Sequence, residues 1–102
     1  MKTLIKNVTI VNEGRTFTGS VLIENDLIAC ILENNDQLKA DITIDASGQL
    51  LLPGVIDDQV HFREPGLTHK GEIYTEAKAG IAGGVTSYME MPNTIPQTTT
   101  IQ

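Results

Sequence analysis

The 102-residue sequence has few positive charges, a single cysteine and no long apolar run. Seven lysines and arginines stand against 13 aspartates and glutamates, so the formal net charge is −6. Such a chain starts from repulsion toward phosphates and anionic lipid, which argues against nucleic-acid and membrane partners. The longest apolar run, Leu27–Leu32, is far shorter than the roughly 20 residues of a membrane span. We therefore expect neither a signal peptide nor a membrane anchor.

The single cysteine, Cys30, lies inside this apolar run, and we expect it to be a small buried hydrophobic residue, not a reactive thiol. One cysteine cannot form a disulfide within the chain. This composition is typical of a reducing compartment, so we expect a cytoplasmic protein. The sequence also lacks internal repeats and a phosphate-binding glycine loop, and Gly83-Gly84 instead predicts the end of a helix.

The first half of the chain predicts short strands separated by turn residues. Four segments rich in valine, isoleucine and threonine are the candidates: Leu4–Val11, Gly19–Glu24, Leu27–Leu32 and Ile42–Ile44. The turn sequence Glu24-Asn25-Asp26 predicts a hairpin over Gly19–Leu32, and residues 33–36 form a second polar break. We expect a small antiparallel β unit that has no chemistry of its own.

After Gly54 the pattern predicts a strand, a helix and a second strand, over Val55–Val60, Glu72–Ala82 and Val85–Met91. The helix is amphipathic, because apolar residues recur on one face at Ile73, Tyr74, Ala77 and Ile81. This order favours a parallel βαβ unit. Two parallel strands alone do not make a domain, so we expect the chain to be a truncated piece of a larger protein.

The densest group of chemically active side chains follows the first of these strands. Strand alternation would place Asp57, Gln59 and His61 on one face, where polar groups are costly unless they are used. His61 at the strand end is a candidate metal ligand, and Arg63 in the following loop is a candidate carboxylate clamp. A structural hydrogen bond made by His61 is the alternative.

A second candidate, Asn93, lies in Met91-Pro92-Asn93-Thr94, just after the next predicted strand. Asn93 can hydrogen-bond a substrate, or it can simply form a turn, since proline and asparagine are turn formers. The spacing from His61 to Asn93 is close to one repeat of an α/β barrel. We therefore expect the two side chains to converge at the same rim.

Three motifs together resemble the opening of a dihydroorotase of the amidohydrolase superfamily: Leu52–Asp57, Val60–Gly66 and Met91–Thr94. Hydantoinases and allantoinases share the Leu-Pro-Gly entry, and the pair Arg63 and Asn93 favours dihydroorotase. The resemblance implies an α/β fold: a small N-terminal β-sandwich-type domain over residues 1–52, then the first βαβ unit of a truncated TIM (β/α)8 barrel over residues 53–102.

The resemblance further implies a zinc-dependent, reversible hydrolysis of dihydroorotate to N-carbamoyl-L-aspartate in pyrimidine biosynthesis, with one or two Zn2+ ions in the parent enzyme. His61 would be a zinc ligand, while Arg63 and Asn93 would hold the substrate carboxylate. Phe62 and Pro65 would shape the loop, and Glu64 would be either a partner of the ligands or a solvated carboxylate. A homo-oligomer or a complex with aspartate transcarbamoylase is the implied assembly.

One position departs from the family pattern, because Gln59 stands where these enzymes carry the first of two histidines. A neutral amide oxygen holds zinc poorly, so we expect a weakened or single-metal site, or none. The remaining ligands and the later catalytic aspartate would lie beyond Gln102, and we expect the 102-residue chain alone to be inactive. A non-catalytic dihydroorotase-like scaffold subunit and a self-sufficient β-rich binding module are the alternatives.

Overall fold

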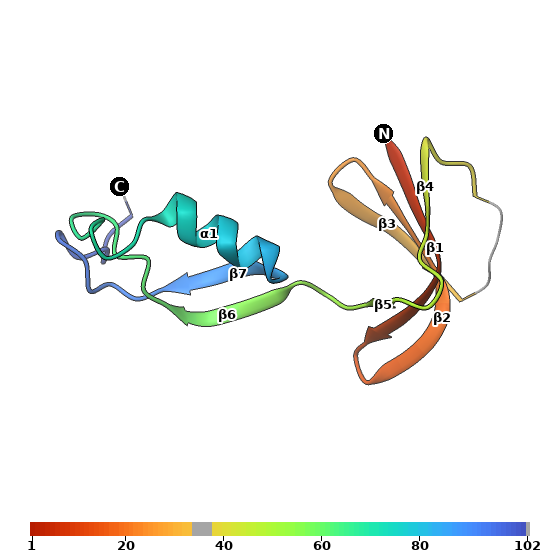
Figure 1. The fold of residues 1–102 in the computed structure, drawn as a ribbon, viewed down its shortest axis with the longest axis horizontal. Coiled ribbons are helices and arrows are strands. Elements are labelled where there is room, and N and C mark those ends of the chain that lie inside the picture. Colours follow the sequence, from red (N-terminus) through yellow and green to blue (C-terminus); the bar gives the residue numbers. More distant parts are fainter. Residues whose placement is uncertain (34–37, 102) are drawn as a thin grey trace. The chain divides into compact units, whose positions relative to one another are not determined.

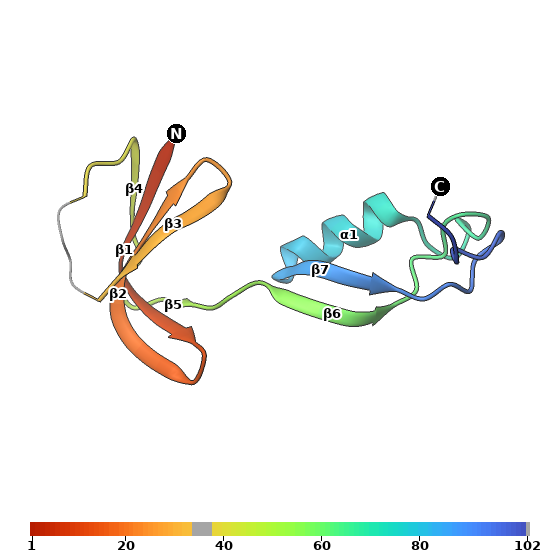
Figure 2. The same ribbon diagram turned by 180° about the vertical axis from the view of Figure 1, so that it is seen from behind.

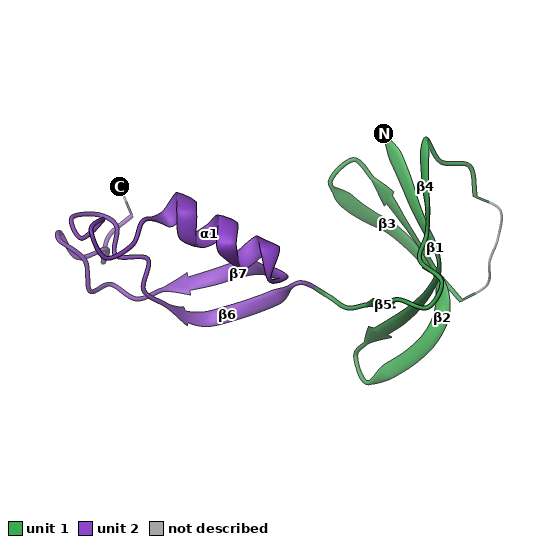
Figure 3. Ribbon diagram, viewed as in Figure 1, with its two compact units in different colours: residues 1–53 green, residues 54–102 purple. Residues whose placement is uncertain are grey.

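The structure is a computed structural model that describes residues 1–33 and 38–101. The chain divides into two compact units, Met1–Pro53 and Gly54–Gln102 (Figure 3). The division falls one residue after the boundary expected from the sequence.

Unit 1 is a five-stranded mixed sheet (Figure 1). Its strands are β1 (Lys2–Asn12), β2 (Arg15–Glu24), β3 (Leu27–Leu32), β4 (Ile42–Asp45) and β5 (Leu50–Leu51). The strand order is β3-β2-β1-β4, and β5 also pairs with β1. Both β1 with β2 and β2 with β3 are antiparallel, which confirms the predicted hairpin over Gly19–Leu32.

The expectation of an antiparallel unit is wrong for the last two strands. Both β4 and β5 run parallel to β1: Thr3–Lys6 of β1 pairs with β4, and Thr9–Ile10 pairs with β5. Sequence patterns indicate which neighbours pair locally, but they carry no information on a strand that pairs with β1 across a long connection. The two-residue strand β5 was not predicted, and residues 34–36 of the predicted polar break lie outside the described residues.

The core of unit 1 is a small cluster of apolar side chains. Its buried members are Val8, Ile10, Val21 and Ala46, with Ile5, Phe17, Ile23 and Leu51 packed against them. Cys30 is a free thiol that is only half-buried, which corrects the expectation of a buried residue. The reason is that β3 is an edge strand, so its side chains have a neighbouring strand on one side only.

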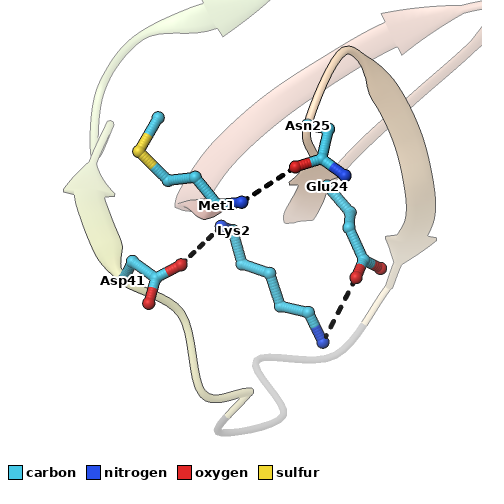
Figure 4. A network of polar contacts seen from close by, with 5 residues as sticks. All are labelled: Met1, Lys2, Glu24, Asn25 and Asp41. Atoms are coloured by element: carbon cyan, nitrogen blue, oxygen red, sulfur yellow. Dashed lines mark hydrogen bonds and ion pairs between the residues drawn. The ribbon is translucent and has the colours of Figure 1, made fainter.

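Polar contacts hold the beginning of β1 between its neighbours (Figure 4). The terminal ammonium of Met1 donates to Asn25 Oδ1 at 2.8 Å, and the Lys2 backbone N–H donates to Asp41 Oδ2 at 2.6 Å. The Lys2 ammonium lies 3.6 Å from the Glu24 carboxylate. These contacts fix the first strand to the β2–β3 turn on one side and to the residue before β4 on the other.

A carboxylate at the end of β4 supports a break in the regular pairing of β1. Asn7 has a positive φ of 58° and lies where the β1–β2 register shifts, between Ile5 and Val8. Its side-chain amide donates to Asp45 Oδ1 at 3.2 Å, and the Ser47 hydroxyl donates to the same oxygen at 2.6 Å. The Ser47 hydroxyl, the Asn7 amide and the Ser47 backbone N–H, in that order, lower the pKa of Asp45 below 3.8.

We expect the free energy of unfolding to depend less on pH in the acid range when Asp45 is replaced by asparagine. Because the pKa of Asp45 is lower in the folded chain, its stabilising contribution is complete above the ordinary pKa of 3.8 and is lost as pH falls through the folded pKa. Urea unfolding at about pH 7 and about pH 3 measures this difference. Asp26→Asn, in an exposed turn, is the control. An unchanged pH slope in Asp45→Asn would contradict the prediction.

Unit 2 is the predicted parallel βαβ unit: β6 (Val55–Val60), α1 (Ile73–Ala82) and β7 (Val85–Glu90). In both views α1 lies along one face of the two strands (Figures 1 and 2). The helix ends at Ala82 with Gly83 as its cap, as predicted. None of its residues is fully buried, because two strands give its apolar face little to pack on. No helix in the described part of the chain has the length and apolarity to cross a membrane.

Candidate functional site

The site is formed by the two loops that leave the carboxyl ends of β6 and β7. Two backbone hydrogen bonds join these loops: Met91 N–H donates to Val60 O at 3.0 Å, and Ile95 N–H donates to Pro65 O at 3.1 Å. Parallel strands place their carboxyl ends at one edge of the sheet, so loops that are far apart in sequence meet there. The loop backbones are therefore fixed to each other at both ends of the candidate site.

His61 and Asn93 contact each other between these two backbone hydrogen bonds, as their spacing predicts. The Nδ1 atom of His61 lies 2.9 Å from Oδ1 of Asn93, and both residues are exposed. An amide oxygen can only accept, so Nδ1–H of His61 is the donor in this contact. This leaves Nε2 of the imidazole with a free lone pair and the Nδ2 amide group of Asn93 free to donate to a ligand.

Arg63 follows in the same loop and has an unusual backbone conformation. Its φ is 70°, in the left-handed region that residues with a side chain rarely adopt. Its carbonyl accepts the Leu67 N–H at 2.9 Å, which closes the turn after it. Arg63 is half-buried, and its guanidinium has no hydrogen-bond or ion-pair partner among the described residues. The guanidinium is thus free to bind a ligand. The left-handed backbone that carries it is strained, as is common at functional sites.

The pairing of β6 is irregular in the stretch where Asp57, Gln59 and His61 are expected to share one face. The β6–β7 register shifts between Asp57 and Val60, and β6 ends at Val60. The Gln59 N–H donates to Asp57 Oδ1 at 3.2 Å, a local contact within β6. Regular alternation is the assumption behind the expected common face, which stays a prediction.

An open pocket of about 340 Å³ lies beside the site, between the strands and α1. Asp57, Val60, His61 and Tyr88 are among its lining residues, whereas Gln59, Arg63 and Asn93 are not. The pocket therefore contains one predicted site residue only. Its helix side is formed by Glu76, Ala79 and Gly80 of α1.

Two acidic residues have roles that sequence reasoning did not assign. Glu64 Oε2 accepts the N–H of Ile73, the first residue of α1, at 2.8 Å, while the N-cap residue Glu72 makes no side-chain cap. Glu64 is therefore a helix cap contributed from the loop, a contact that neither sequence expectation for this side chain included. Glu90 at the end of β7 accepts the Phe62 N–H at 3.0 Å, and no sequence signal predicts this contact.

The residues of this site do not form a zinc centre by themselves. No three histidine, cysteine, aspartate or glutamate side chains gather to hold a metal ion within residues 1–33 and 38–101. His61 is the imidazole that contacts Asn93, and the position two residues earlier is the exposed Gln59. One imidazole with neutral amides does not fit the three or four nitrogen, sulfur or carboxylate ligands that zinc takes.

The sequence of this chain is similar to those of known dihydroorotases. The family model described as Dihydro-orotase-like matches residues 48–100, just over half of the chain. The chain is 44% identical over 97 residues to a dihydroorotase of Enterococcus faecalis, covering 94% of this chain and 23% of that protein. It is 45% identical over 96 residues to a dihydroorotase of Lactobacillus acidophilus, covering 94% of this chain and 22% of that protein. The chain thus spans less than a quarter of these relatives.

A solved structure agrees with the fold as well. L-hydantoinase (dihydropyrimidinase) from Arthrobacter aurescens matches with a TM-score of 0.88 at 31% identity, covering 96% of this chain and 22% of that chain. This match confirms the predicted fold class, a small β domain followed by the βαβ unit that begins an α/β barrel. The family match includes β6, β7 and both loops of the site. The chain belongs to the dihydroorotase-like family.

Proposed function

We propose that this chain is the amino-terminal part of a dihydroorotase that interconverts dihydroorotate and N-carbamoyl-L-aspartate in pyrimidine biosynthesis. The observation that carries the proposal is the 2.9 Å contact between His61 and Asn93. Arg63 follows His61 by two residues in the same loop, and its guanidinium has no partner among the described residues. The names of the sequence relatives support the same substrate class. The cytoplasm is the proposed location.

The proposed roles follow from the hydrogen-bonding capacity of each group. The oxygen of Asn93 is occupied by His61, so its amide nitrogen has only N–H groups to offer to a ligand. A guanidinium also offers only N–H groups. Arg63 and Asn93 together are thus donors for an anion, and a substrate carboxylate is a suitable acceptor. A neutral ring substrate such as a hydantoin has no carboxylate to offer these donors.

The metal requirement is part of the proposal. Zn2+, one or two ions, is the proposed cofactor of the whole protein, and His61 is the ligand that this stretch contributes through Nε2. All other ligands would come from residues outside this chain, because the described residues offer no cluster. We therefore propose that the 102-residue chain alone is inactive. A homo-oligomer or a complex with aspartate transcarbamoylase is the proposed assembly.

Gln59→His is expected to strengthen zinc binding by the intact protein about tenfold or more, because an imidazole replaces a neutral amide as a ligand. Isothermal titration with Zn2+ and metal content after dialysis measure the change. Asp58→His is the matched control, since it adds an exposed imidazole one position away on the same strand. Equal zinc affinity of both variants and the unsubstituted protein would contradict the prediction.

The proposed function is tested by turnover of the intact protein that contains these residues. We expect hydrolysis of dihydroorotate and ring closure of N-carbamoyl-L-aspartate, with hydantoin a much poorer substrate. Preference for hydantoin would favour a hydantoinase, the activity for which the matching solved structure is named. No turnover of either, together with co-purification with aspartate transcarbamoylase, would favour a scaffold subunit, the alternative suggested by Gln59.

A further inference from the structure

Glu90 connects the two strands of unit 2 below the candidate site. It is the last residue of β7 and pairs in register with Val60, the last residue of β6. Its Oε2 atom accepts the backbone N–H of Phe62 at 3.0 Å. A side chain of one strand therefore binds the backbone of the loop that leaves the other strand.

The peptide that Glu90 holds is the one that joins His61 to Phe62. The Phe62 ring is buried and packs edge-on against Tyr88 of β7, with ring centroids 5.0 Å apart. Phe62 is thus fixed at both its backbone and its ring, whereas His61 on one side is exposed and Arg63 on the other is half-buried. The orientation of both neighbours depends on this one anchored residue.

The second carboxylate oxygen of Glu90 shows that stability alone does not explain this side chain. Oε1 is buried and has no hydrogen-bond partner among the described residues. A desolvated carboxylate oxygen without a donor is unfavourable. Groups that break the rules of burial tend to gather at functional sites.

The geometry points to Glu90 as a positioning residue that sets the placement of His61 and Arg63 relative to Asn93. It ends β7 three residues before Asn93, and it binds the loop backbone between His61 and Arg63. A carboxylate in this place couples the two loops that carry the candidate site. Its effect on the substrate rests on the proposed function, whereas its effect on the loop does not.

The first arm of the test measures the loop directly. Hydrogen exchange of the intact protein is compared for the unsubstituted protein, Glu90→Ala, Glu90→Gln and the exposed control Glu72→Gln. We expect exchange in peptides spanning residues 60–66 to rise about tenfold or more in Glu90→Ala only. Glu90→Gln keeps an oxygen acceptor and should restore most of the protection. Unchanged exchange in Glu90→Ala, or an equal rise throughout residues 54–101, would overturn the inference.

The second arm measures the site through steady-state kinetics with dihydroorotate. Glu90→Ala is expected to raise KM about tenfold with a smaller change in kcat, because misplaced binding groups weaken substrate capture first. Glu90→Gln should stay within about twofold of the unsubstituted protein. A normal KM in Glu90→Ala would overturn the inference. Absence of turnover in the unsubstituted protein would instead count against the proposed function, and the exchange result would still decide the role of Glu90.

Discussion

Replacing Arg63 by asparagine is expected to lower kcat/KM for dihydroorotate by about 100- to 1000-fold, a loss of about 3 to 4 kcal/mol. The guanidinium has no partner among the described residues, so its removal takes away ligand binding without breaking an internal contact. Asparagine is the suitable replacement because it tolerates the left-handed backbone that Arg63 adopts. Steady-state kinetics of the intact protein measures the effect.

Two comparisons separate loss of the guanidinium from damage to the fold. Arg15→Asn removes the only other arginine of the chain, which lies in unit 1 and pairs with Glu33, and should leave kcat/KM unchanged. Dihydrouracil lacks the carboxylate, so Arg63→Asn should not reduce any turnover of that ring. Arg63→Lys keeps the charge without the planar fork and should lose about tenfold. Activity of Arg63→Asn within a few-fold of the unsubstituted protein would contradict the assignment.

The fold could be predicted from the sequence wherever pairing is local. The hairpin of β2 and β3 and the order strand, helix, strand after Gly54 follow from alternation, turn residues and helical periodicity. The parallel pairing of β4 and β5 with β1 does not follow, because the strands that pair are separated by the whole of β2 and β3. Local patterns limit which segments are strands but not which distant strands they join.

The parts of the site that follow from strand topology could be predicted from the sequence. The parts that depend on side-chain contacts between distant residues could not. Parallel strands bring His61 and Asn93 to one edge, and the sequence suffices to expect this. The irregularity after Asp57 is a property of the paired strands, and no sequence pattern predicts it. The contacts of Glu64 and Glu90 join residues far apart in sequence, so only the folded chain shows them.

The second large effect is expected at Gly66, where an added methyl group meets backbone. Gly66 has a φ of +82°, and a Cβ built on it would overlap the carbonyl oxygen of Ile95. The N–H of the same residue, Ile95, donates to Pro65 O. The Ile95 carbonyl therefore cannot move without disturbing this hydrogen bond between the two loops. We expect Gly66→Ala to destabilise unit 2 by about 3 kcal/mol or more, as strain from the backbone and from overpacking combine.

Gly14→Ala is the matched control, because Gly14 has a similar φ of +74° but nothing within 4 Å of an added Cβ. Gly14→Ala should lower the free energy of unfolding by about 1 kcal/mol, because alanine at a positive φ is strained but meets no neighbouring atom. Both tyrosines of the chain, Tyr74 and Tyr88, lie in unit 2, and the chain has no tryptophan. Denaturant unfolding followed by tyrosine fluorescence therefore reports unit 2 selectively, while far-UV circular dichroism reports the whole chain, including the unit 1 turn that contains Gly14. If Gly66→Ala costs no more than Gly14→Ala, close contact between the loops does not hold the site together, and the positions of His61, Arg63 and Asn93 must depend on other parts of the protein.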